Sequence, residues 1–255
     1  ATHPTEHRYG TLISWAYWDM GVVGWVPEYS PGPEAWVTDY NGDGEVDPAE
    51  AMRFNDRELG GRYFSPWTSF QHPELGEVEI GGWHRKFWGQ NPPAEFLEEE
   101  CEAQLPWITY LIRQAPRLAM DGPSVTSLGD GSFRIRATVS NEGFLPTSLT
   151  GRGAVGQETS LGRVRNPVVR PPTLNLGLRG AELVEGSLRV ETAHLRGTGP
   201  FLEEVGPASE TVEWTVRATD SPAFVQVVTR SPKAGVVRSG WVELRPSDPQ
   251  GRETP

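Results

Sequence analysis

The sequence contains a single cysteine, Cys101, and no long hydrophobic run. One cysteine excludes an internal disulfide framework. Because no run approaches about 18 apolar residues, the sequence predicts no membrane-spanning helix, and it shows no signal-peptide stretch at its start. The net charge of −11 and the lack of a basic stripe argue against nucleic acid as a partner, since phosphates are bound by clustered lysines and arginines.

Charge and tryptophan are unevenly distributed along the 255 residues. Residues 1–120 hold 19 acidic and 8 basic side chains and eight of the ten tryptophans, whereas residues 121–255 hold 15 of each charge. This change in character predicts two domains, 1–120 and 121–247. The Pro- and Asp-containing segment 248–255 is expected to be a disordered tail.

The first domain mixes helical patterns with loops. Residues 9–29 predict a short helix or turn followed by a buried strand near 22–26. Pro48 opens a helix of about three turns, and Asn91 followed by Pro92 is typical of a second helix start. Apolar residues then recur at three- and four-residue steps up to Ala115, which predicts an amphipathic helix on a core, kinked or broken at Pro106.

From about Ser124 the sequence predicts short strands. The segment "SFRIRATVSN" alternates apolar and polar residues, and similar runs follow near 182–190, 210–219, 223–230 and 235–245. "GDGS" at 129–132 is typical of a hairpin turn. Regular short strands with turn signals predict an all-β antiparallel sandwich.

The stretch "DYNGDGEVDPAE" at 39–50 matches the EF-hand calcium loop. Such loops take ligands from positions 1, 3, 5, 7, 9 and 12 and place glycine at position 6, which is Gly44 here. The expected calcium ligands are Asp39, Asn41, Asp43, the carbonyl of Glu45, Asp47 and Glu50. Because the entering helix is missing and there is only one loop, we expect calcium to brace the fold rather than to switch it.

Four segments carry a resemblance to a known family, the first two more strongly than the others. "LISWAYWDMGVVGWVPEYSPG" resembles the segment of zinc carboxypeptidases of the carboxypeptidase A type that carries their catalytic glutamate, with Glu28 placed 11 positions after Tyr17. "QNPPAEFLEEECEAQLPWITYLI" resembles the last helix of that catalytic domain. "HPELGEVEIGGW" and "GFLPT" look like features of bacterial members. The resemblance implies that 1–120 is the C-terminal part of an α/β catalytic domain, with a mixed sheet and a calcium-loop insertion.

The resemblance implies zinc-dependent hydrolysis of C-terminal peptide bonds, with Glu28 as general base and then acid. Family members hold zinc with two histidines and a glutamate, in an H-x-x-E pair and a later histidine far before the catalytic glutamate. Here His3 and Glu6 spell that pair and His7 follows, but only 27 residues precede Glu28. We therefore expect zinc in a longer parent protein, with its ligands upstream and none in this chain, which alone is expected to be inactive. Location is expected to be extracellular or periplasmic.

Other residues have competing interpretations. Glu79 is a second candidate carboxylate, although a structural role suits it better. His72 and His84 resemble a metal pair but are more typical of surface residues. The aromatic residues of 63–88 are expected to pack rather than to bind a ligand. Two alternatives to the peptidase remain open: a non-enzymatic calcium-braced binding module, and a pseudo-enzyme whose parent protein lacks the zinc ligands.

Overall fold

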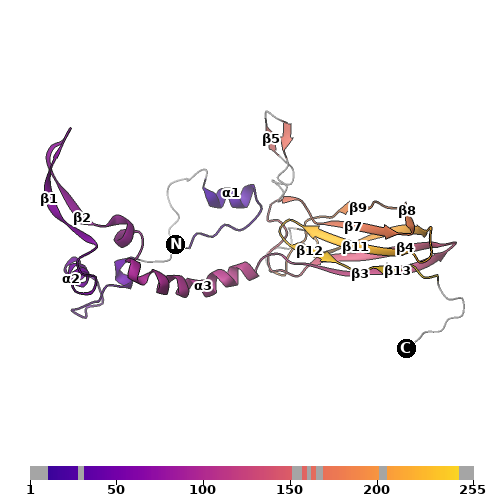
Figure 1. Cartoon of the computed structure of the whole chain (residues 1–255), viewed down its shortest axis with the longest axis horizontal. Coiled ribbons are helices and arrows are strands. Elements are labelled where there is room, and N and C mark those ends of the chain that lie inside the picture. Colours follow the sequence, from indigo (N-terminus) through magenta and orange to yellow (C-terminus); the bar gives the residue numbers. More distant parts are fainter. Residues whose placement is uncertain are drawn as a thin grey trace. The chain divides into compact units, whose positions relative to one another are not determined.

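The computed structural model describes residues 11–27, 32–150, 157–159, 162–164, 169–200 and 206–246, in two compact units (Figure 1). We call Val26–Tyr110 the hairpin unit, and Ala1–Trp25 together with Leu111–Pro255 the sandwich unit. No helix in the described ranges is long and apolar enough to cross a lipid bilayer. The predicted tail, 248–255, lies outside the described residues.

The hairpin unit combines short helices with one antiparallel strand pair. Its elements in chain order are η1 (Pro33–Ala35), α2 (Pro48–Glu58), β1 (Phe64–His72), β2 (Gly76–Trp83), η2 (Arg85–Gly89), η3 (Ala94–Phe96) and the first part of α3 (Leu97–Arg113). The helix predicted from Pro48 is confirmed as α2. Its start is fixed by a capping box, in which Asp47 Oδ1 accepts the Glu50 N–H at 2.8 Å and the Glu50 carboxylate accepts the Asp47 N–H at 3.2 Å.

A small core holds the hairpin unit together. Its buried residues are Val37, Ala51, Phe54, Leu59, Tyr63 and Trp88. Asn55, also buried on α2, accepts the N–H of Tyr63 through Oδ1 at 3.0 Å. This bond ties α2 to the residue that leads into β1.

The sandwich unit begins with α1 (Leu12–Trp18) and continues with two antiparallel sheets. The first has the order β3-β4-β10-β8. The second has the order β12-β11-β7-β9, with β13 also paired to β11, and a separate hairpin β5-β6 completes the set. The strand bounds are β3 Leu118–Gly129, β4 Ser132–Asn141, β5 Gln157–Thr159, β6 Gly162–Val164, β7 Thr173–Arg179, β8 Ala181–Glu185, β9 Arg189–Glu191, β10 Ser209–Ala218, β11 Phe224–Ser231, β12 Gly235–Arg238 and β13 Val242–Glu243.

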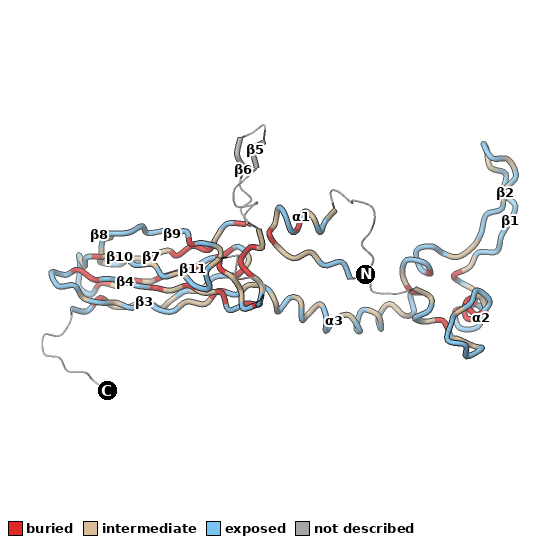
Figure 2. The backbone as a smooth tube through the Cα atoms, turned by 180° about the vertical axis from the view of Figure 1, so that it is seen from behind, coloured by how far each residue is buried: buried red, intermediate tan, exposed pale blue. Residues whose placement is uncertain are grey.

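The strand predicted from the alternating residues of "SFRIRATVSN" is confirmed as β4. Phe133, Ile135 and Val139 are buried, whereas Arg134 and Arg136 between them are exposed. Inward-facing residues of both sheets form one core, seen as the buried stretches of the sandwich strands in Figure 2. The predicted antiparallel sheets are thus confirmed, and they pack as a sandwich.

Details of the strand predictions differ. The turn at 129–132 is confirmed as the β3-β4 connection, where Asp130 has φ 46° and Gly131 φ 78°, values that suit a two-residue hairpin. The single run expected at 182–190 is instead two strands in different sheets, β8 and β9. A glycine and a serine at 186–187 separate them.

The buried strand expected near 22–26 is wrong. Residues 21–27 form neither helix nor strand, and Trp25 and Val26 are more than half exposed. An extended segment needs a neighbouring strand to satisfy its backbone, and none pairs with it in the described residues. Within 11–110 the strands are those of the β1-β2 hairpin, so the expected mixed sheet is not formed by the described residues.

Helix α3 also departs from expectation. It is preceded by η3, so Asn91 is not its N-cap, and it continues through Pro106 without a break. No residue of α3 is buried, as Figure 2 shows along its length. The lost hydrogen bond at Pro106 is tolerated because water can reach this exposed backbone. The prediction that the helix lies on a core is wrong for the described chain.

Candidate functional site

The loop 39–50 is folded around its own backbone amides. Asp39 accepts the N–H of Gly42 through Oδ1 at 2.6 Å and the N–H of Gly44 through Oδ2 at 2.9 Å. Asn41 and Asp43 each accept the N–H two residues further on, at 2.8 and 2.9 Å. Gly44 has φ 88°, a conformation that favours glycine, as the sixth position of a calcium loop requires.

Glu50 joins the end of this loop to its beginning. Its Oε1 accepts the N–H groups of Tyr40 and Asn41 at 2.7 and 2.9 Å, and the residue is buried. The carboxylate of the twelfth loop position is therefore held beside the second and third positions. Because Glu50 also belongs to the capping box of α2, the loop and the helix form one structure.

The loop amides favour the charged form of Asp39, but the side chains of the loop do not surround one point. The N–H groups of Gly44 and Gly42 hold the pKa of Asp39 below its ordinary value of 3.8. Among the described residues, no three His, Cys, Asp or Glu side chains are close enough together to hold a metal ion. Calcium would therefore require the carboxylates to turn from the loop amides toward a common centre.

The residues of the predicted peptidase site are only partly within the described ranges. Glu28, His3, Glu6 and His7 lie outside them. Glu79 lies on β2 opposite Ser69 and is exposed. In the described residues Glu79 belongs to no group of three or more His, Cys, Asp or Glu side chains that could hold a metal ion.

The two histidines of the hairpin unit are not brought together. His72 ends β1, where its Nδ1 accepts the N–H groups of Glu74 and Leu75 at 3.2 and 3.1 Å. His84 follows the other end of β2 and lies 3.4 Å from the Ser65 hydroxyl. Their positions at opposite ends of the hairpin support the interpretation that they are not a metal pair.

The aromatic cluster divides into two groups. Trp83 and Trp88 stack with their ring centroids 4.0 Å apart, and Tyr63 packs with them in the small core. Trp67 and Phe70 instead lie exposed on β1. Packing explains the first group only, because the hairpin has no second layer in the described residues to cover the others.

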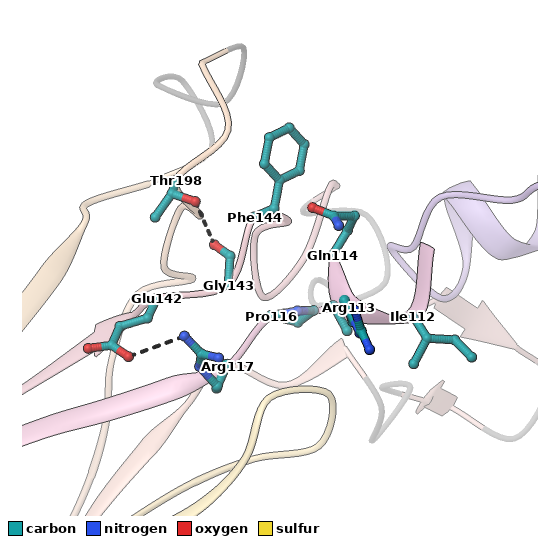
Figure 3. Close-up of a pocket in the computed structure, with 10 residues that line it drawn as sticks. Ile112, Arg113, Gln114, Pro116, Arg117, Glu142, Gly143, Phe144 and Thr198 are labelled. Atoms are coloured by element: carbon teal, nitrogen blue, oxygen red, sulfur yellow. Dashed lines mark hydrogen bonds and ion pairs between the residues drawn. The ribbon is translucent and has the colours of Figure 1, made fainter. Parts of the chain in front are cut away.

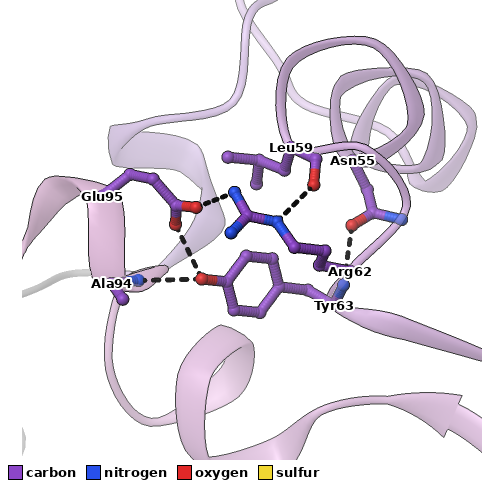
Figure 4. Close-up of polar contacts among 6 residues, drawn as sticks. All are labelled: Asn55, Leu59, Arg62, Tyr63, Ala94 and Glu95. Atoms are coloured by element: carbon purple, nitrogen blue, oxygen red, sulfur yellow. Dashed lines mark hydrogen bonds and ion pairs between the residues drawn. The ribbon is translucent and has the colours of Figure 1, made fainter.

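A polar network beside this core was not predicted from the sequence (Figure 4). The Tyr63 hydroxyl donates to Glu95 at 2.6 Å and accepts the Ala94 N–H at 3.0 Å, while Arg62 pairs with the same carboxylate and donates to the Leu59 carbonyl at 2.9 Å. Burial and the Glu95 carboxylate raise the pKa of Tyr63, and the Tyr63 hydroxyl lowers the pKa of Glu95. More than thirty residues separate Glu95 from Arg62 and Tyr63, so no local pattern marks the network.

A cleft of about 780 Å³ lies where the last turn of α3 passes into β3 (Figure 3). Its walls come from residues 112–117, from 142–144 and from Thr198. Arg117 pairs with Glu142 at 3.5 Å, and the Thr198 N–H donates to the Gly143 carbonyl at 2.9 Å. Because its polar groups largely satisfy one another, this cleft is best explained as a structural joint.

The "GFLPT" segment forms part of that joint. Asn141, just before it, accepts the N–H groups of Arg117 and Gly143 at 2.9 and 3.0 Å and donates to the Leu145 carbonyl at 2.8 Å. The Leu145 N–H in turn donates to the Gln114 carbonyl at 2.9 Å. One amide side chain thus fixes the path of the chain out of α3.

A half-buried lysine holds the segment after α1 against the sandwich. Lys233 Nζ donates to the carbonyls of Met20 and Gly21 at 2.9 and 3.2 Å, and burial lowers its pKa to about 8. Nearby, His194 lies 3.2 Å from the Thr147 hydroxyl, and burial, with Lys233 adding to it, lowers its pKa. These residues lie far apart in sequence, and no spacing signal could have predicted their meeting.

Comparison with known proteins assigns no activity. Residues 117–240 match a family model described as a domain of unknown function (DUF8731). The match covers just under half of the chain and spans the sandwich from β3 to β12. No curated protein matches the sequence.

Proposed function

We propose that this chain is the C-terminal part of a secreted zinc carboxypeptidase, with an accessory β-sandwich, that acts outside the cytoplasm on peptide C-termini. The sequence resemblance of 12–32 and 90–112 suggests this activity. The observation that supports it best is the large apolar surface exposed on the same two segments. In a folded protein, apolar surface of this extent marks an interaction site.

The exposed side chains are large and follow both helices. Around α1, Leu12 is 71% and Val26 62% exposed; on α3, Leu105 is 61% and Ile112 68% exposed. We infer that the upstream part of the same catalytic domain covers these faces in the parent protein. The segment 22–26 would then become a strand of the mixed sheet, whereas it forms no strand in the described chain.

In this proposal the chain contributes a proton shuttle. Zinc would supply an activated water when bound, and the resemblance implies that its ligands belong to the upstream part. Glu28 is assigned the transfer of a proton to the leaving amine. The role follows from the resemblance and from the position of Glu28 in the matched segment.

The test uses the longer parent protein, wild type against Glu28→Gln, with Glu79→Gln as the matched control. Zinc content and release of C-terminal residues from a peptide are measured together. We expect equal zinc in all three proteins and a loss of several orders of magnitude in turnover for Glu28→Gln alone. Loss in Glu79→Gln instead would transfer the role to Glu79, and retained activity in both variants would remove Glu28 from the mechanism.

The same proposal gives calcium a bracing role in loop 39–50. The support is the loop conformation, with Gly44 at its turn and Glu50 joining its two ends. Bound calcium would neutralise carboxylates that otherwise repel one another and would stabilise α2 through Glu50. An extracellular location suits a single site, because isolated extracellular modules bind calcium at about 10⁻⁴–10⁻³ M.

Calcium titration followed by calorimetry tests this role. Asp39→Asn and Glu50→Gln are expected to lose binding, whereas Glu45→Gln is expected to keep it, because position 7 uses its backbone carbonyl. All three variants remove one negative charge, so a general charge effect would weaken them equally. At 100 times the dissociation constant, calcium should add about 2.7 kcal/mol to the free energy of unfolding.

The second candidate is a non-enzymatic calcium-braced binding module. The separately folded sandwich, with its own family match, favours it. Zinc content of the parent protein separates the two proposals, since the binding module requires none. Reading the upstream sequence for the H-x-x-E pair and a later histidine separates the active enzyme from a pseudo-enzyme.

A further inference from the structure

Three arginines surround one pocket on the second sheet of the sandwich. Arg170 precedes β7, Arg189 begins β9 and Arg230 lies near the end of β11. Together with Thr173, Asn175, Ser231 and two prolines they line a pocket of about 440 Å³. No acidic residue is among its lining residues.

Strand register brings two of these arginines to the same face. Arg230 lies opposite Thr173 on β7, and Arg189 lies opposite Asn175 two residues along the same strand. Residues directly opposite one another share a face, and Leu174 between them points into the core and is fully buried. Arg230 and Arg189 therefore flank β7 on its outer face, with their strands about 10 Å apart.

The three arginines form no ion pair in the described residues, although Glu191 lies opposite Thr173 on the same face of the sheet. Arginine stays charged at all physiological pH values. In the described part of the chain, none of the three lies within 4.0 Å of a carboxylate; the ion pairs found there involve other arginines, such as Arg136 with Glu213. Three like charges around one cavity repel one another, and a bound anion would relieve that repulsion.

The neutral groups of the pocket also offer protons. Ser231 is buried, and its Oγ accepts the N–H groups of Lys233 and Ala234 at 3.4 and 3.3 Å, which leaves its hydroxyl proton for another acceptor. Asn175 donates to the Thr173 hydroxyl oxygen at 3.2 Å, so that hydroxyl proton also points elsewhere. The Asn175 amide also donates to the Val228 carbonyl at 3.2 Å. The three guanidinium groups and the two hydroxyl protons favour a ligand that accepts hydrogen bonds.

We propose that the pocket binds a tetrahedral oxyanion, a phosphate or sulfate ester group carried by a soluble small molecule. Guanidinium groups bind such anions through two parallel N–H bonds, which makes arginine the preferred residue for them. The pocket is larger than a single phosphate needs, so part of the carrier can enter as well. This binding needs neither zinc nor Glu28 and is independent of the proposed peptidase activity.

The test is calorimetric titration of the full chain with inorganic phosphate at constant ionic strength. Arg189→Gln and Arg230→Gln remove one guanidinium each, and Arg134→Gln on the outer face of β4 is the matched control, since Arg134 is also exposed and unpaired in the described residues. We expect one saturable site, a Kd raised about tenfold by either single variant, no binding in the double variant, and wild-type binding in the control. Circular dichroism verifies that each variant keeps its sheets.

Three results would overturn the proposal. Phosphate binding that persists in the double variant, or that falls equally in Arg134→Gln, would show only a diffuse positive field. Sulfate competition and tighter binding of a phosphorylated sugar than of its unmodified sugar support a soluble oxyanion ligand. Arginine-dependent cosedimentation with phosphatidic acid vesicles, without saturable phosphate binding, would refute it in favour of a membrane surface.

Discussion

Replacing Gly143 by alanine should destabilise the sandwich unit, because a Cβ at this position has no space. Gly143 is buried, and the added atom would overlap the Ala115 carbonyl and lie 2.6 Å from Pro116 Cα and 2.7 Å from Arg117 N. All three are backbone atoms and cannot rotate away. The chain on the other side is also fixed, since the Gly143 carbonyl accepts the Thr198 N–H at 2.9 Å.

The expected loss follows from three contributions. Overpacking costs about 1–3 kcal/mol, and displacing the backbone at Ala115 weakens the hydrogen bond from Leu145 N–H to the Gln114 carbonyl, worth about 1 kcal/mol. Because alanine restricts the unfolded chain more than glycine does, it offsets about 0.4–1 kcal/mol of this loss in the free energy of unfolding. The net loss of about 1–3.6 kcal/mol corresponds to a Tm lower by about 2–14 °C for a chain of this size.

Urea unfolding of the full chain, followed by circular dichroism, measures this loss. Gly240→Ala is the matched control, because nothing lies within 4 Å of its added Cβ, and it should gain about 0.4–1 kcal/mol. If the two variants differ by less than about 0.5 kcal/mol, which is the typical range for harmless substitutions, the close approach of Gly143 to the end of α3 does not exist in solution.

Two further predictions concern the same unit. The pKa of Lys233, lowered to about 8, means that the unfolded chain binds more protons than the folded chain between pH 8 and its ordinary value of 10.5. The free energy of unfolding should therefore rise with pH across that window. Thermal denaturation at several pH values should show this rise in the wild type and not in Lys233→Met. The same dependence of unfolding free energy on pH in both proteins would contradict the prediction. Trp214→Phe should cost about 2 kcal/mol, since Trp214 is 1% exposed and donates to the Ser187 carbonyl at 2.7 Å; urea unfolding within error of wild type would show that the core closes around phenylalanine.

Where local signals dominate, the sequence was sufficient to predict the structure. Asp47, Pro48 and Glu50 predict the start of α2 because the cap, the fixed φ and the returning carboxylate all act within four residues. The alternation of apolar and polar residues in 132–141 likewise predicts β4, since a strand buried on one face must place every second side chain inward. Both elements lie as expected.

Where structure depends on distant residues, the sequence failed. The apolar spacing of α3 predicts a face packed on a core, but periodicity states only which side of a helix is apolar and not what covers it. Strand 22–26 failed for the same reason, because a strand exists only with a neighbour. Arg170, Arg189 and Arg230 are separated by up to sixty residues, and only the pairing of β7 with β9 and β11 brings them together.

The fold of loop 39–50 also bears on how the protein ages. Asn41 is followed by Gly42, a pair prone to deamidation when the glycine nitrogen attacks the asparagine side chain, and asparagine is among the thermolabile residues. Here the Gly42 N–H is held by Asp39 at 2.6 Å, and Asn41 Oδ1 is held by the Asp43 N–H at 2.8 Å. The attacking nitrogen and its target are thus each engaged elsewhere, although Asn41 is exposed. The rate at which Asn41 deamidates therefore depends on how long the loop stays folded.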